Sequence, residues 1–149
     1  TSVSAASTMK DYLDKGTGYL YRFTADQLVD GNLFTCWQAS ASQDQWVRLD
    51  FGGERLVSRV EIANGFQRTD ALGDLFTMND RIRVARIVFI GDTETAETIA
   101  FLPDEVGYKA FTFVPQRCRA LRIEIRETWP GTKWRHLSIS EVRAFGVRA

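Results

Sequence analysis

The stretch that decides the fold is Gln45-Trp46-Val47-Arg48-Leu49-Asp50-Phe51. Its apolar residues Val47, Leu49 and Phe51 alternate with charged ones, and Gly52-Gly53 follows directly. Successive side chains of a β-strand point to opposite faces of a sheet, so this alternation predicts a strand that is buried on one side only. The two glycines then predict a turn at the end of this strand.

The same alternation returns along the rest of the chain, with turn residues such as Asn64-Gly65 between the alternating stretches. A helical period is absent, apart from a turn or short helix expected near residues 69–78. Several short strands separated by turns indicate a single all-β domain, either a sandwich or a barrel. The further strands are predicted at residues 57–62, 81–90, 110–114, 121–126 and 142–145.

The composition is that of an ordinary globular domain, because the 149 residues are 44% hydrophobic and 26% charged. The 19 basic side chains are balanced by 19 acidic ones. A nucleic-acid binder concentrates positive charge to displace counterions from phosphates, so this balance argues against such a partner. The chain has no leader-like segment and no apolar run of about 20 residues that could span a bilayer. We expect it to be cut from a longer protein or to have lost a leader.

The two cysteines, Cys36 and Cys118, lie in strand-like settings. Neither has a second Cys or a His at the spacing of metal ligands, which argues against a zinc site. The pair forms either one disulfide in a secreted domain or two buried thiols. The sequence leaves both alternatives open, because the separation of the Cα atoms decides between them.

Four separated segments resemble the discoidin or coagulation factor V/VIII C-type domains, in the order and spacing of that family. Together they cover residues from about 26 to 146, and the weakly patterned residues 1–17 precede them. The resemblance implies a discoidin-type jelly-roll β-sandwich, a galactose-binding-domain-like fold. The segments are Leu28-Val29-Asp30-Gly31-Asn32 with Thr35-Cys36-Trp37, Trp46-Val47-Arg48-Leu49-Asp50-Phe51-Gly52, Cys118-Arg119-Ala120-Leu121-Arg122-Ile123, and Ile139-Ser140-Glu141-Val142-Arg143-Ala144-Phe145-Gly146.

Within that superfamily, three segments look most like a bacterial subgroup. This subgroup is the glycan-binding or translocation domain joined to secreted NAD glycohydrolase toxins. The resemblance implies a secreted or cell-surface location and a tether to another domain, with no NAD chemistry in this chain. The segments are Thr35-Cys36-Trp37, Ile62-Ala63-Asn64-Gly65-Phe66 and Trp129-Pro130-Gly131-Thr132-Lys133-Trp134.

The resemblance also implies a structural Ca²⁺ at Asp30, Asn32, Thr35 and Glu141. Calcium takes six to eight oxygen ligands, which a tight Asp-Gly-Asn loop and a distant glutamate can provide together. The ion would hold this loop against the last strand. The alternative is that the loop is only a turn in which Asp30 accepts hydrogen bonds from its own backbone.

A ligand site is expected at Phe66, Arg68 and Asn79, because the chain resembles carbohydrate-binding module family 32 there. An arginine fork and an asparagine amide suit adjacent sugar hydroxyls, since they offer several donors and an acceptor at fixed angles. The alternative for Arg68 is a surface salt bridge with Asp70 or Asp74.

The same expected site includes Gln38, Trp134 and His136. Gln38 stands where family members carry a histidine, which argues against the usual galactose specificity. One of the two tryptophans Trp129 and Trp134 is expected in the core. Trp134 is the preferred sugar platform, because an indole face can stack on the apolar side of a sugar ring. His136 is the only histidine, and a structural role is its alternative.

Leu72, Leu75, Phe76 and Met78 form an apolar cluster in a predicted loop. In lipid-binding relatives such loops enter a membrane. The alternative, which we favour, is a short helix that folds back on the sandwich and buries these side chains in a satellite cluster.

The sequence therefore predicts a non-catalytic module that binds a glycan or a glycosylated cell-surface molecule. The runner-up is a phospholipid- or protein-binding discoidin module that uses loop 66–80. An enzyme is disfavoured, because no nucleophile-elbow motif accompanies His136. The carboxylate pair Asp70 and Asp74 is the remaining candidate for glycosidase chemistry.

Overall fold

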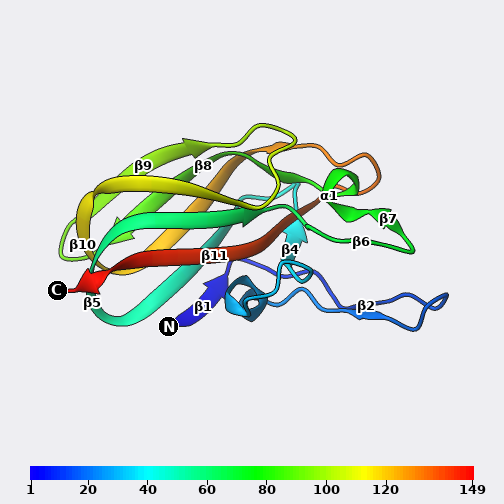
Figure 1. Cartoon of the computed structure of the whole chain (residues 1–149), viewed down its shortest axis with the longest axis horizontal. Helices are drawn as coiled ribbons and strands as arrows, with labels where there is room; N and C mark the ends of the chain where they lie inside the picture. Colours follow the sequence, from blue (N-terminus) through cyan, green and yellow to red (C-terminus); the bar gives the residue numbers. More distant parts are fainter.

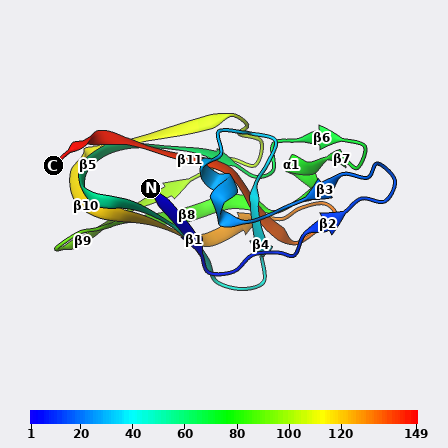
Figure 2. The same ribbon diagram turned by 90° about the horizontal axis from the view of Figure 1, so that it is seen from below.

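The alternating stretches of the sequence join into long, bent strands in a computed structural model that describes residues 1–149. β5 (Gln45–Asn64) contains both residues 45–51 and 57–62, and β10 (Tyr108–Trp129) contains both 110–114 and 121–126. Gly52 has a φ of 73°, which favours glycine where β5 bends. Figure 2 shows β5 and β10 curling over at one end of the molecule. Each of these strands therefore contributes to two layers.

The main sheet has seven strands, which pair antiparallel in the order β4-β11-β5-β10-β8-β9, and β1 pairs with β5. One layer combines β1 (Ser2–Ala5), the first half of β5, the second half of β10, β8 (Arg81–Ile90) and β9 (Glu94–Ala100). The other combines β4 (Trp37–Ser40), β11 (His136–Arg148), the second half of β5 and the first half of β10. The predicted all-β sandwich is confirmed.

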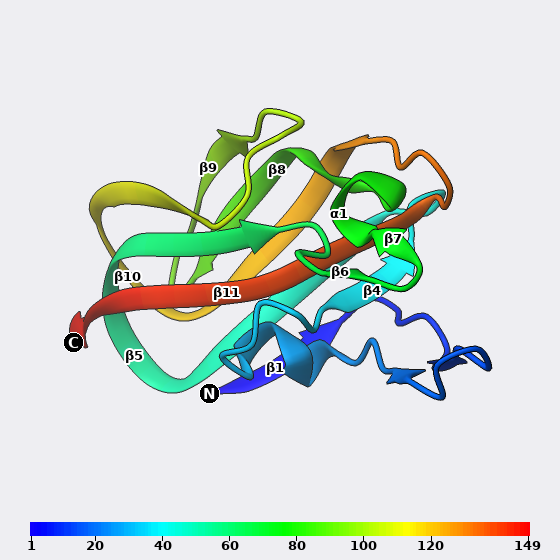
Figure 3. The same cartoon turned by 45° about the vertical axis from the view of Figure 1, so that its right-hand side comes forward.

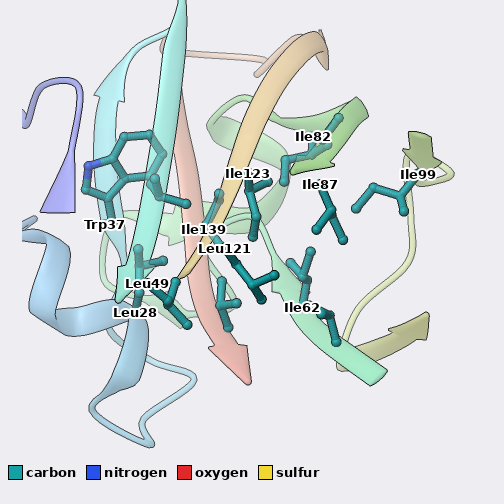
Figure 4. Packing of buried hydrophobic residues seen from close by; sticks show 14 of the residues in the cluster. Leu28, Trp37, Leu49, Ile62, Ile82, Ile87, Ile99, Leu121, Ile123 and Ile139 are labelled. Atoms are coloured by element: carbon teal, nitrogen blue, oxygen red, sulfur yellow. The ribbon is translucent and has the colours of Figure 1, made fainter. Parts of the chain in front are cut away.

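The core lies between these layers, where the inward side chains of both meet. Figure 4 shows Leu49, Ile62, Leu121 and other aliphatic side chains pointing toward one another. Trp37 is fully buried at one end of this cluster, and its Nε1 donates to the Ser7 carbonyl at 3.0 Å. Removing a large aliphatic side chain from water contributes about 1.5–3 kcal/mol, so this cluster is the main source of stability.

Four short elements extend from one end of the sandwich, where Figures 1 and 3 place β2, β6, β7 and α1. β2 (Tyr12–Leu13) pairs with β3 (Leu20–Tyr21), and β6 (Thr69–Asp70) pairs with β7 (Gly73–Asp74). The one-turn helix α1 (Leu75–Met78) follows β7, and the 3₁₀-helix η1 (Ala25–Val29) precedes β4. The short helix expected within residues 69–78 is confirmed for its last turn. No helix has the length and apolar character needed to cross a bilayer.

The apolar side chains of this end form a second cluster of their own. Leu75 and Phe76 are 2% and 5% exposed, and Leu72 and Met78 pack against the cluster that contains Leu75. The satellite-cluster interpretation is confirmed, and insertion of loop 66–80 into a membrane loses its motivation because these side chains are already covered. The buried members are Tyr21, Phe23, Cys36, Phe66 and Leu75.

Candidate functional site

A cavity of about 240 Å³ opens where the two short hairpins meet the end of the sandwich. Of the ligand residues expected from the sequence, all except Arg68 line it. The expected residues that do so are Gln38, Phe66, Asn79, Trp134 and His136; Met9, Lys10, Asp11, Tyr12, Tyr21, Phe23, Leu72 and Leu75 complete the lining.

The floor of the cavity is aromatic and rigid. Phe66 is 4% exposed and meets Tyr21 and Phe23 edge-on, with ring centroids 6.2 and 6.4 Å apart. Edge-to-face contacts of this kind fix ring orientation as well as burying area. The cavity therefore presents a preformed apolar base to a ligand.

Amide groups form one wall. Gln38 Nε2 donates to Asn79 Oδ1 at 3.2 Å and to Ser138 Oγ at 2.9 Å, and Asn79 Nδ2 donates to the Leu75 carbonyl at 3.0 Å. Gln38 Oε1 accepts no hydrogen bond within the chain. Since every fully buried polar side-chain atom has a partner, this oxygen must be accessible, and Gln38 lines the cavity. Asn79 is 2% exposed and holds Gln38 in place. Gln38 thus offers an acceptor that Asn79 orients.

The loop that carries Trp134 and leads into His136, the first residue of β11, is anchored by Asp80, whose side chain is fully buried. The carboxylate accepts hydrogen bonds from Gly131 N at 2.8 Å and Arg135 Nε at 2.9 Å, and Asp80 N donates to the His136 carbonyl at 2.9 Å. Burial lowers the pKa of His136 below its usual range, so the imidazole is neutral near pH 7. A neutral imidazole supplies one donor and one acceptor.

Arg68 lies beside this cavity rather than in its lining. Its Nε is 2.9 Å from Asp70 Oδ2, its Nη1 donates to the Tyr19 hydroxyl at 3.0 Å, and its guanidinium lies 4.1 Å from the Tyr19 ring centroid. The salt-bridge alternative with Asp70 describes this geometry. The expected contact of Arg68 with a sugar would require these interactions to be released.

The carboxylates of Asp70 and Asp74 have separate structural roles. Asp70 also binds the Tyr21 hydroxyl and accepts from Leu72 N, whereas Asp74 accepts from Phe76 N at 3.2 Å and caps α1. The two carboxylates therefore do not form a free pair for glycosidase chemistry.

Trp129 occupies a different place from Trp134. Its Nε1 donates to the Phe101 carbonyl at 2.8 Å, and the Arg83 guanidinium lies 4.4 Å from its ring centroid. Neither tryptophan lies fully in the core, because both are partly exposed, and the buried tryptophan is Trp37. Only Trp134 lines the cavity.

The loop of Asp30 meets the last strand through Glu141. Asn32 N donates to Asp30 Oδ1 at 2.9 Å, Thr35 Oγ1 donates to Asp30 Oδ2, and Gly31 N donates to both Glu141 oxygens at 3.1 and 3.2 Å. The chain contains no group of three or more His, Cys, Asp or Glu side chains arranged for a metal. Asp30 therefore accepts hydrogen bonds within its own turn, and Glu141 accepts hydrogen bonds from the backbone of that turn.

The Asp30–Glu141 pair nevertheless has the charge of a cation site. Glu141 is 2% exposed, and neither carboxylate has a salt-bridge partner, since Arg143 pairs with Glu61 at 2.7 Å. Burial, together with the neighbouring Asp30, raises the pKa of Glu141 from its usual 4.5 to about 7. Both carboxylates are oxygen donors of the kind that a hard cation such as calcium prefers.

Cys36 and Cys118 are free thiols that pack in different clusters, so the disulfide alternative is wrong for this structure. The sequence did not identify Met9, Tyr12, Tyr21 and Phe23 as part of a site. Their only signal is an unusual density of tyrosines in a weakly patterned segment, because the hairpin that brings them to the cavity has strands of two residues each.

Solved structures with this fold include several carbohydrate-binding domains. The module CBM32-5 of a Clostridium perfringens family 89 enzyme, in complex with GalNAc-β-1,3-galactose, matches with a TM-score of 0.71 at 17% identity, over 97% of this chain and 94% of that one. The family 32 module of Clostridium perfringens NanJ, in complex with galactose, gives 0.70 at 20% identity over 96% and 91%. The lectin domain of lectinolysin, complexed with Lewis B antigen, gives 0.66 at 20% identity over 97% and 92%. At these identities the likeness establishes the fold.

No curated protein sequence matches the chain. The family model that matches does so over residues 27–123, which is more than half of the chain, and it is described as a NedA-like, galactose-binding domain of the F5/F8 type C class. The resemblance found in the sequence to the factor V/VIII C-type domains is confirmed. The chain therefore belongs to the NedA-like galactose-binding domain family, a family of carbohydrate-binding modules.

Proposed function

We propose that this domain is a non-catalytic module that holds a terminal sugar of a glycan in the cavity between Phe66 and Trp134. The observation that carries this proposal is the combination of an aromatic floor with an oriented amide acceptor in one cavity. Sugar rings have apolar faces and polar edges, so a site of this composition matches both sides of the ligand.

Each lining group has a defined part in this proposal. Trp134 is held at its backbone by the Met78 carbonyl at 2.9 Å, and its indole face would cover the apolar side of the ring. Gln38 Oε1 would accept from a hydroxyl or an acetamido N–H, and neutral His136 would donate or accept at the ring edge. The named ligands of the related structures contain galactose or N-acetylgalactosamine, so sugars of that type are the first to test.

We also propose that Asp30 and Glu141 hold a structural Ca²⁺, with the Thr35 hydroxyl and oxygens of Asn32 completing the ligand set. The ion would supply charge neutralisation at this loop and no chemistry toward the sugar. Support comes from the two adjacent carboxylates without a cationic partner. The loop would then be fixed to β11, which also carries His136.

The module is proposed to act in a secreted or cell-surface setting, tethered to a larger protein, and to attach that protein to glycosylated surfaces. An origin next to a NAD glycohydrolase-type toxin rests on the resemblance of three segments alone and stays a prediction. The lack of a catalytic role is supported by the structural engagement of Asp70 and Asp74. Binding of phospholipid or protein through loop 66–80 is the weaker alternative, since Leu75 and Phe76 are buried.

The proposal is tested by titration calorimetry of galactose and N-acetylgalactosamine against the wild type, Trp134→Ala and Trp129→Ala. Loss of an aromatic stacking partner that contributes about 1.4 kcal/mol weakens binding about tenfold. We expect this loss for Trp134→Ala only, because Trp129, at the end of β10, is equally an indole but lies outside the cavity. Failure of the calcium-loaded wild type to bind any sugar on a broad glycan array would overturn the assignment.

A further inference from the structure

Tyr12 lies at the mouth of the cavity, on the β2–β3 hairpin. It belongs to the cavity lining, yet 50% of its surface is exposed, which makes it the most open aromatic side chain there. The adjacent Leu13 is equally exposed at 52% but does not line the cavity. Successive side chains of a strand point to opposite faces, which accounts for this difference.

The other aromatic rings around the cavity are already covered on at least one side. Tyr21, Phe23 and Phe66 are buried against one another. Tyr19 has the Arg68 guanidinium 4.1 Å from its centroid. Tyr12 has a single aromatic neighbour, Tyr21, at a centroid separation of 5.9 Å with the planes inclined by 36°. With half of its surface exposed, the Tyr12 ring is accessible to a ligand at the mouth of the cavity.

The hairpin holds Tyr12 in this position. Met9 N donates to the Gln38 carbonyl at 2.7 Å, which joins the incoming segment to β4 inside the site. Asp14 N donates to the Tyr19 carbonyl at 2.9 Å, and Tyr12 pairs with Tyr21 across the hairpin. Tyr21 is itself fixed through its hydroxyl by Asp70. A ring positioned in this way loses little conformational entropy when a ligand binds.

Charged groups flank this ring at the same rim. Lys10 and Asp11 both line the cavity and are exposed, and neither takes part in a salt bridge of the chain. An ammonium and a carboxylate in the same cavity lining as an aromatic ring can donate hydrogen bonds to sugar hydroxyls and accept them from these groups. The rim thus repeats the composition of the cavity, an apolar face with polar groups at its edge.

We propose that Tyr12, with Lys10 and Asp11, forms a second sugar subsite next to the cavity, so that the ligand is an oligosaccharide of at least two units. This inference rests on the proposed function. The terminal sugar occupies the cavity, and the sugar that precedes it stacks on the exposed ring of Tyr12. Tyr12 then determines preference for chain length, whereas Trp134 and Gln38 determine whether a terminal sugar binds at all.

The experiment compares N-acetylgalactosamine with the disaccharide GalNAc-β-1,3-galactose, titrated by calorimetry against the wild type, Tyr12→Ala, Tyr12→Phe and Leu13→Ala. We expect the wild type to bind the disaccharide about tenfold more tightly than the monosaccharide, which corresponds to one additional stacking contact of about 1.4 kcal/mol. Tyr12→Ala removes this advantage, so that the variant binds the two sugars with equal affinity. Tyr12→Phe keeps it, because the ring face remains, and Leu13→Ala keeps it because Leu13 faces away from the cavity.

Equal affinity of the wild type for both sugars, or an undiminished disaccharide affinity in Tyr12→Ala, overturns the second subsite while the proposed function stands. A Tyr12→Ala variant that loses both sugars equally shows that Tyr12 supports the cavity instead, which also overturns it. Binding of neither sugar by the wild type overturns the proposed function for this sugar class and the subsite with it. Circular dichroism of each variant shows that the fold is intact.

Discussion

Asp80 is a buried charge whose surroundings explain why it is tolerated. Its carboxylate receives hydrogen bonds from Thr128, Gly131 and Arg135, and the Arg135 side chain is 64% exposed. A buried carboxylate whose oxygens all accept hydrogen bonds stabilises the loop that provides the donors. At the level of the single residue, Asp80 therefore positions Trp134 and His136 without itself lining the cavity.

We predict that Asp80→Asn lowers the free energy of unfolding by about 2 kcal/mol, because a charged acceptor is replaced by a group that faces donors with its own N–H bonds. Asp92→Asn is the matched control, since Asp92 pairs with Arg119 at 3.2 Å but is 86% exposed. The control should change stability by less than about 0.5 kcal/mol. Urea denaturation measures both, and equal effects would contradict the role given to Asp80.

The two thiols provide a second prediction for single residues. Burial raises the pKa of Cys118 to about 11 and that of Cys36 further still, so neither is a thiolate near neutral pH. We expect a thiol-reactive disulfide reagent to leave the native protein unlabelled and to label both cysteines in denaturant. Addition of a reductant should leave the melting temperature unchanged. A reductant-dependent fall would indicate the disulfide that this structure excludes.

Among the elements, the loop between β10 and β11 depends on a close approach at Gly131. A Cβ atom there would lie 2.4 Å from the Trp134 carbonyl oxygen and 2.5 Å from that of Met78. Both neighbours are backbone atoms and cannot give way without moving α1 or the loop. Gly131 thus allows the loop to lie against α1 with Trp134 over the cavity.

We predict that Gly131→Ala costs about 1–3 kcal/mol of stability, the usual range for an overpacked site, and that it weakens sugar binding as well. Gly16→Ala is the control, because its nearest contact, Asp14 Oδ1, is at an ordinary 3.4 Å and its backbone conformation is unstrained. Thermal melting and calorimetric titration of both variants provide the measurement. Unchanged sugar affinity in Gly131→Ala would show that Trp134 does not depend on this approach.

The success of sequence-based prediction also differs between elements. Strands with one buried and one exposed face, such as the two halves of β5, were predicted because apolar and polar residues alternate along them. β9 was missed since it is an edge strand with most of its side chains exposed. β1 was missed because it has only four small residues, which alternate too briefly to be recognised although Val3 and Ala5 pack against the core.

For the molecule as a whole, Asp30 and Glu141 join the start of the sandwich to its last strand. The folded state raises the pKa of Glu141 to about 7 from 4.5, so it binds this proton more tightly than the unfolded chain does. The resulting stabilisation is complete below about pH 4.5 and is lost as the pH rises through 7. Calcium would replace the proton, so its effect grows with pH.

We predict that calcium at about 100 times its dissociation constant stabilises the domain by about 2.7 kcal/mol at pH 8, or about 5–10 °C in melting temperature. The increase should be much smaller at pH 5, where the proton competes with the ion. Glu141→Gln should abolish it, with magnesium and added chelator as ion controls in scanning calorimetry. An equal calcium effect at both pH values would contradict a site at Glu141.

The sequence by itself determined the all-β class, most of the long strands and the family, because these depend on alternation and on short segments that keep their order along the chain. It also pointed to Gln38, Phe66, Asn79, Trp134 and His136, which the fold brings to one cavity. Only the tertiary structure decided that Arg68 binds Asp70 and that the N-terminal hairpin completes the cavity. The sequence offered the Arg68–Asp70 pair only as one alternative, because the choice depends on Tyr19 and Tyr21, which hold Arg68 and Asp70 from 49 residues earlier in the chain. No local sequence pattern can predict contacts between segments so far apart.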